Sequence, residues 1–111
     1  MKKILFTLLI FTGIFSFAQQ ADVENYIKKE SIGGKLDFTK NVEREYATPF
    51  IRFGDTIYNK KDFTILLWAA KVRALGIESL DKTIILWENI NRRSLTDPEK
   101  KALKTGFESK F

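Results

Sequence analysis

The run Phe63–Ala70 limits the possible folds more than any other segment, because it is apolar almost without interruption. As a helix it shows apolar side chains on every side, and such a helix is normally buried inside a domain. Its eight residues are too few to span a membrane. The run therefore predicts a central helix over about Asn59–Leu75. Asn59 or Asp62 is the expected N-cap, and Gly76-Ile77 fits a Schellman ending.

Three other segments have helical patterns. Ala21–Ile32 places Val23, Tyr26 and Ile27 on one stripe and is followed by Gly33-Gly34. The segment Leu80–Arg93 has a broad apolar face, formed by Leu80, Ile84, Ile85, Leu86, Trp87 and Ile90. A last helix is expected from Thr96, because threonine followed three residues later by Glu99 is a capping box. Its narrow apolar seam consists of Leu103, Phe107 and Phe111.

The pattern changes between the first helix and the central one. Leu36 and Phe38 alternate with polar neighbours, which predicts a short strand-like run, whereas Asn41–Glu45 is charged and favours no structure. Two β-prone runs flank Gly54-Asp55, a dipeptide that suits a two-residue hairpin turn. The alternative is an irregular loop whose aromatic residues cover the core. We expect a mainly α (α+β) fold: about four helices packed round a central apolar helix, with a small β-hairpin before it.

Two heptapeptides resemble each other at a distance of nineteen residues, Asp62–Trp68 and Asp81–Trp87. One interpretation is an internal repeat of one helix with its turn. The other is that two helices independently use an aspartate cap and similar core residues, since the match ends after the tryptophans. In either case we expect Trp68 and Trp87 to be mostly buried, because a small domain without disulfides needs large side chains in its core.

The first residues read as an export signal. Lys2 and Lys3 precede the mostly apolar segment Ile4–Phe17, whose fourteen residues are fewer than the ~20 that a transmembrane helix needs. Small residues Ser16 and Ala18 predict cleavage between Ala18 and Gln19. The segment resembles signals of Gram-negative bacteria that end in Phe-Ala-Gln. We therefore expect a signal peptide over residues 1–18, one small globular domain over residues 19–111, and a periplasmic or secreted protein without a membrane span.

Cleavage changes the charge and leaves few covalent options. The chain has no cysteine, so neither a lipidated cysteine nor a disulfide is available. Loss of Lys2 and Lys3 leaves 17 basic residues of the original 19 against 14 acidic ones, and the formal net charge falls from +5 to +3. This modest balance, outside the cytoplasm, argues against nucleic acid as a partner.

The residues that usually carry catalysis are scarce. Without histidine or cysteine, the commonest general base, a thiol nucleophile and the preferred transition-metal ligands are all missing. No glycine-rich phosphate loop is present, and the aspartates are too scattered for a calcium loop. A carboxylate pair such as Glu43 and Glu45 is the remaining route to a hydrolase. A solvated charged segment explains that pair better, so we expect no enzyme, no cofactor and no metal.

A binding role is the remaining interpretation. The hypothetical contact surface combines the hairpin tip with the end of the third predicted helix, namely Arg52, Phe53, Asp55, Tyr58, Arg92 and Arg93. The sequence thus favours an exported, non-catalytic interaction module whose partner is a protein or an envelope polymer. An inhibitor or immunity-type protein and a small carboxylate-based hydrolase are the alternatives. Asp55-Thr56-Ile57 also resembles an acceptor pattern for bacterial O-glycosylation, which would modify Thr56.

Overall fold

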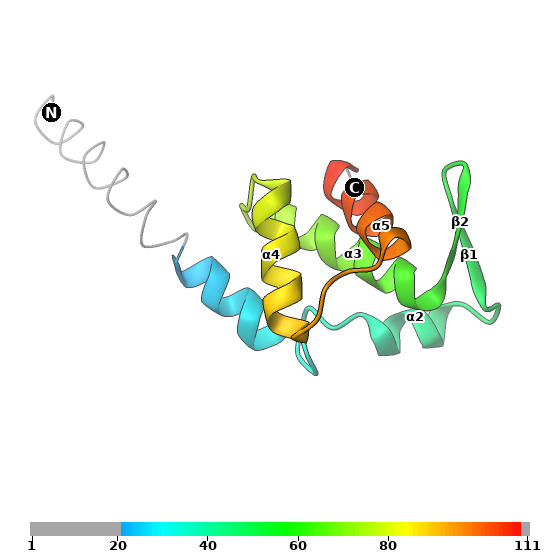
Figure 1. The fold of residues 1–111 in the computed structure, drawn as a ribbon. Coiled ribbons are helices and arrows are strands. Elements are labelled where there is room, and N and C mark those ends of the chain that lie inside the picture. The colour runs from blue at the N-terminus through cyan, green and yellow to red at the C-terminus, as the bar shows by residue number, and fades with distance from the viewer. Residues whose placement is uncertain (1–20, 110–111) are drawn as a thin grey trace, which may run out of the picture.

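The computed structural model describes residues 21–109, which form five helical segments and one β-hairpin (Figure 1). Residues 21–30 form the first helix. The later elements are α2 (Thr39–Glu45), β1 (Phe50–Phe53), β2 (Thr56–Asn59), α3 (Lys60–Ala74), α4 (Leu80–Asn91) and α5 (Asp97–Glu108). The expected fold class, mainly helical with a small hairpin before a central helix, is confirmed. Residues 21–109 contain five helices rather than about four, because α2 adds one.

Helix α3 is the centre of the domain, as its composition predicts. Figure 1 shows it running through the middle of the molecule, with α5 across it, α4 near one end and the hairpin at the other. Its buried residues are Phe63, Ile65, Leu66, Trp68, Ala69 and Val72. Phe63 and Leu66 belong to a core cluster beneath the hairpin, whereas Trp68 and Val72 belong to a larger cluster with α4 and α5. One helix therefore joins the two halves of the core.

Both ends of α3 follow the local sequence. The Asn59 side chain accepts a hydrogen bond from the Asp62 backbone N–H at 2.7 Å, so Asn59 is the N-cap. At the other end Gly76 has a φ of +118°, and the Ile77 N–H donates to the Val72 carbonyl at 3.4 Å. These are the features of a Schellman ending, which confirms that prediction.

The hairpin has the predicted two-residue turn at Gly54-Asp55. The strands pair antiparallel, with Ile51 opposite Tyr58 and Phe53 opposite Thr56. Gly54 has a φ of +62°, and a positive φ at the first turn residue only is the pattern of a type II′ turn. The inner face packs on the body through Ile51 and Tyr58, each 5% exposed, and the Tyr58 hydroxyl donates to Thr105 Oγ1 at 3.3 Å.

The strand-like run expected at Leu36 and Phe38 is wrong. Residues 31–36 form turns, and α2 (Thr39–Glu45) covers the segment Asn41–Glu45, whose charges favoured no structure. The alternation arises because Leu36 points into the core at 2% exposure while Asp37 organises the turn. The Asp37 carboxylate accepts hydrogen bonds from the Gly33 N–H and from the Thr39 N–H and hydroxyl. Only Val42 of α2 is buried, so the helix leaves almost no apolar periodicity.

The helix caps confirm one sequence-based prediction and contradict another. The capping box of Thr96 and Glu99 is present as predicted. Ser79 caps α4, so aspartate caps are wrong for both helices that contain the similar heptapeptides. Asp62 is the third residue of α3 and Asp81 the second of α4, so the heptapeptides are not in the same register relative to their helix starts. The prediction of buried tryptophans is confirmed, with Trp68 4% and Trp87 7% exposed.

Several sequence-based predictions lie outside the described residues. They include the signal peptide over residues 1–18, its cleavage between Ala18 and Gln19, and the place of Phe111 in the last apolar seam. Within residues 21–109, no helix combines the length and the apolarity that a membrane crossing requires.

Candidate binding groove

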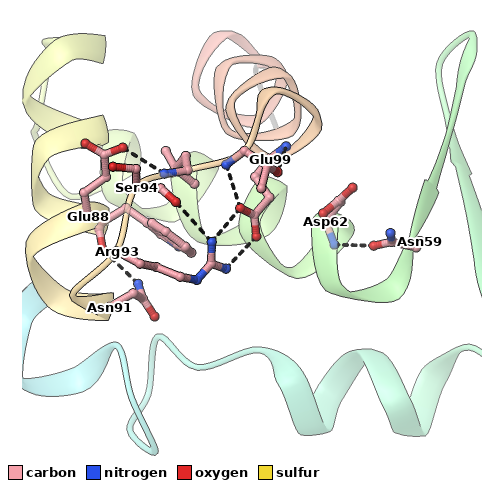
Figure 2. Close-up of polar contacts among 10 residues, drawn as sticks. Asn59, Asp62, Glu88, Asn91, Arg93, Ser94 and Glu99 are labelled. Atoms are coloured by element: carbon pink, nitrogen blue, oxygen red, sulfur yellow. Dashed lines mark hydrogen bonds and ion pairs between the residues drawn. The ribbon is translucent and has the colours of Figure 1, made fainter.

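Arg93 is held in place by a sharp change of chain direction at the end of α4. Arg92 has a φ of +55°, a left-handed conformation that ends the helix, and the Arg93 N–H donates to the Glu88 carbonyl at 3.3 Å. The Glu88 carboxylate then accepts the Leu95 N–H at 2.8 Å. These contacts fix the segment between α4 and α5, from which the Arg93 side chain extends toward α5 (Figure 2).

The Arg93 guanidinium is bound on two sides. Its two terminal nitrogens donate to the two carboxylate oxygens of Glu99, each at 2.7 Å, and Nη1 also donates to the Ser94 carbonyl. Its carbon lies 4.7 Å from the Trp87 ring centroid, in cation–π contact. The guanidinium is therefore a fixed positive charge rather than a free surface cation.

Glu99 accepts these bonds from a buried position, with only 4% of the residue exposed. The hydrogen bonds from Arg93, followed by that from the Thr96 N–H, lower the pKa of Glu99 to about 2, against the opposing effect of its burial. Asp62 lies close enough that its pKa is raised, first by its own burial and then by the negative charge of Glu99. Figure 2 shows the two carboxylates on neighbouring helices.

This divergence of pKa between two acids also occurs in acid–base catalysts. Here, however, both Glu99 oxygens accept hydrogen bonds from Arg93, and one of them also accepts the Thr96 N–H. Neither Asp62 nor Glu99 lines the groove described next. The arrangement is accordingly a structural clamp between the end of α4 and the start of α5.

A groove of about 390 Å³ lies beside this clamp, between the loop over residues 31–38 with α2, the first half of α3 and the end of α4. Its apolar lining comes from Ile32, Leu36, Phe38, Ile65, Trp68 and Trp87. Its polar lining comes from Ser31, Asp37, Thr39, Glu43, Lys60, Lys61, Thr64, Asn91 and Arg93. The volume is within the range of about 300–1,000 Å³ that is usual for ligand sites.

Hydrogen bonds connect the two tryptophan positions in the floor of the groove to their neighbours. The Trp68 indole N–H donates to Ser31 Oγ at 2.9 Å, and the Ser31 hydroxyl in turn donates to the Ile27 carbonyl. The Asn91 side chain donates to the Trp87 carbonyl at 2.9 Å. Within residues 21–109 no buried side-chain nitrogen or oxygen lacks a hydrogen-bond partner. The buried polar side chains around the groove are therefore all hydrogen-bonded within the protein.

Some of the charged side chains along the rim of the groove have ion-pair or hydrogen-bond partners, and one does not. Glu43 pairs with Lys60 at 3.2 Å. Burial raises the pKa of Asp37, but hydrogen bonds from Thr39 and Gly33 outweigh it and lower the pKa overall. Lys61 is exposed and has no ion pair among the described residues. Three cations and two carboxylates line the groove, and both carboxylates already accept bonds from the protein.

The structure separates the residues of the contact surface that the sequence suggested. Figure 1 shows the hairpin and α4 toward opposite ends of α3, so Arg52 and Asp55 do not meet Arg92 and Arg93. Of the six residues, Arg93 lines the groove, and Arg52, Asp55 and Arg92 are exposed elsewhere.

The two aromatic residues of that surface support the hairpin from within. Tyr58 is buried, and the half-buried Phe53 ring lies 6.3 Å from the Phe63 ring, centroid to centroid. Thr56, the possible O-glycosylation site, is half-buried on the same inner face.

The main feature that sequence reasoning missed is the loop over residues 31–38, which forms one wall of the groove. Its approach to α4 depends on long-range packing that has no local signal. Trp68 and Trp87 both line the groove, but the sequence predicted only that they are buried. Glu43 and Glu45 are both exposed and belong to α2. The described residues contain no group of acidic side chains arranged to hold a metal ion.

Comparison of the whole chain with protein-family models, with curated proteins and with solved structures finds no match.

Proposed function

We propose that this protein is an exported, non-catalytic binding module of the bacterial envelope, which holds part of a partner protein or an envelope polymer in the groove beside α3. The observation that carries the proposal is the groove itself, whose floor includes Trp68 and Trp87 and whose rim carries Lys60, Lys61 and Arg93. An apolar floor with a few fixed polar groups is the usual composition of a binding site.

The state of the three cations supports a partner with negative charge. Arg93 is oriented by Glu99 and Trp87, and Lys60 is paired with Glu43. The exposed amine of Lys61 is therefore the rim charge that can take a carboxylate or another anionic group without breaking an existing ion pair. The formal net charge of +3 expected after signal cleavage acts in the same direction, because it favours approach of an anionic partner.

The carboxylates nearby support binding rather than hydrolysis. A carboxylate-based hydrolase needs one acid that donates a proton and another that activates water or attacks the substrate. In the groove, Asp37 accepts three hydrogen bonds from its own turn and Glu43 pairs with Lys60. Each acid therefore has a structural partner.

The experiment is site-specific photo-crosslinking in the exporting host. A photoreactive amino acid with an apolar side chain replaces Ile32 in the groove wall or, as a matched control, Ile85, an exposed isoleucine of α4 outside the groove. We expect a discrete adduct from position 32 and none from position 85, and we expect Lys61→Glu to weaken the adduct because it reverses the unpaired charge at the groove rim. Equal labelling from both positions, or none from either, would contradict the proposal.

A further inference from the structure

The hairpin carries an exposed face on which, among the described residues, only Asn59 forms a side-chain hydrogen bond, as the N-cap of α3. This outer hairpin face consists of Phe50, Arg52, Ile57 and Asn59, all of which are exposed. Phe50 is 61% and Ile57 65% exposed, which are high values for large apolar side chains. Isolated exposed apolar residues are ordinary, but here two of them lie on one small face beside a cation.

The strand register brings these side chains together. Arg52 is directly opposite Ile57, and Phe50 is opposite Asn59, so Phe50 and Ile57 are diagonal neighbours on the same face. Diagonal cross-strand neighbours are about 7–8 Å apart, within reach of an aromatic ring. Arg52 is therefore next to both apolar side chains, since Phe50 lies two residues earlier on its own strand and Ile57 lies directly opposite.

The hairpin also presents this face rigidly. Its inner side is fixed by the buried Ile51 and Tyr58, and the Tyr58 hydroxyl reaches α5 through Thr105. At the start of β1, the Thr48 hydroxyl donates to the Phe50 carbonyl at 2.8 Å, which occupies a backbone group at the strand edge. Figure 1 shows the hairpin projecting beyond the first turn of α3, away from α4. The partner surface is accordingly the side-chain face rather than the strand edge.

Charge distinguishes between the possible occupants. Arg52 is the only charged residue of the face, and it has no ion pair among the described residues. A second copy that docked face to face about a two-fold axis would bring Arg52 against its own counterpart, which is unfavourable. A segment with apolar side chains beside a carboxylate matches all three groups.

We propose that the outer hairpin face docks a segment of a partner protein in which apolar side chains flank an aspartate or glutamate. This surface is separate from the groove, because none of its four residues lines the groove. The inference therefore goes beyond the proposed function, and either can fail without the other.

The test uses the purified exported protein and a phage-displayed library of random peptides, followed by affinity measurements on synthetic copies of the enriched peptides. We expect enrichment of peptides that combine aromatic or aliphatic residues with Asp or Glu. Ile57→Thr keeps a β-branched side chain in the strand and should weaken binding about tenfold, because apolar burial is lost. The matched control is Ile85→Thr on α4, where an isoleucine 56% exposed lies far from the hairpin.

Charge reversal gives the sharpest result. When the Arg52→Glu variant is used as the bait, the library should yield peptides with Lys or Arg in place of the acidic residue. When the bait is Arg44→Glu, with its change on α2, the original peptide preference should be unchanged. Three outcomes would overturn the inference. The first is no enrichment, and the second is peptides whose affinity is unchanged by the substitutions at positions 52 and 57. The third is peptides whose affinity is lowered by Lys61→Glu instead. Binding to phosphatidylglycerol vesicles that is lost in Ile57→Thr, without peptide binding, would also overturn it and assign the face to a lipid surface.

Discussion

At the scale of single residues, Glu99 connects two elements that the chain would otherwise leave loosely joined. Its carboxylate accepts hydrogen bonds from the Thr96 N–H of its own helix cap and from both terminal nitrogens of Arg93. Because the side chain is 5% exposed, water cannot replace a lost partner easily. The clamp therefore stabilises the α4–α5 connection, and through Arg93 and Trp87 it also shapes one wall of the groove.

Replacing Glu99 by glutamine should lower the free energy of unfolding by about 2 kcal/mol at neutral pH. The pKa of Glu99 is about 2 in the fold, below its ordinary 4.5, so its ionised form stabilises the protein above pH 4.5. That contribution is lost as the pH falls toward 2. Urea titrations of both proteins at several pH values should thus show a difference that shrinks between pH 4.5 and pH 2. Glu78→Gln, at an exposed glutamate, is the control and should show little difference at any pH.

A second prediction compares lysine substitutions at two neighbouring arginines. Arg93→Lys keeps the charge but loses the bidentate bond to Glu99 and the planar contact with Trp87, so the melting temperature should fall by a few degrees. Arg92→Lys alters an exposed side chain without either contact and should leave the melting temperature almost unchanged. Equal effects of the two substitutions in thermal unfolding would show that the clamp does not stabilise the fold.

At the scale of elements, the most extensive contact among α2, the hairpin, α3, α4 and α5 is the crossing of α3 and α5, which depends on one glycine. Gly106 is buried in α5, and a methyl group there would overlap the backbone carbonyl of Leu66 in α3. The Leu66 carbonyl carbon would lie only 2.7 Å from the added carbon. Because the obstacle is backbone on a central helix, neither partner can yield by changing a rotamer.

Gly106→Ala should therefore destabilise the protein by about 3 kcal/mol or more, although alanine is the better helix former by about 1 kcal/mol. Chemical denaturation followed by circular dichroism measures the change. Lys104→Ala, at an exposed position of the same helix, is the matched control and should be nearly neutral. A stabilised Gly106→Ala protein would mean that α3 and α5 do not approach as closely as described.

The elements also show which parts of the fold local sequence can predict. The hairpin and the ends of α3 depend on Gly54, Asn59 and Gly76, whose conformational preferences act within a few residues. Helix α2 has one buried residue and no side-chain cap, so its formation depends on packing against α3. The same holds for the site. Arg93 was predicted as a contact residue from its place at a helix end, whereas its partner Glu99 was predicted only as part of a capping box. The groove wall at 31–39 required tertiary packing.

At the scale of the whole molecule, the domain holds its shape without covalent links. The chain has no cysteine, and its two core clusters meet along α3. The helix over residues 21–30 already contributes Ile27, fully buried, to the larger cluster. A cleavage between Ala18 and Gln19 would therefore leave every described element in place, whereas a cut several residues later would remove part of the core.

This placement leads to a prediction about processing. N-terminal sequencing of the exported protein should begin at Gln19, since Ser16 and Ala18 provide the small residues that a signal peptidase requires. Ala18→Phe should block the cut, and the uncut chain should accumulate at the membrane with its apolar segment attached. Gln20→Asn, a small change beyond the cut, should be processed normally. A mature chain that began beyond Ile27 would lack one buried member of the larger core cluster. It would contradict both the predicted cleavage site and the predicted start of the domain at residue 19.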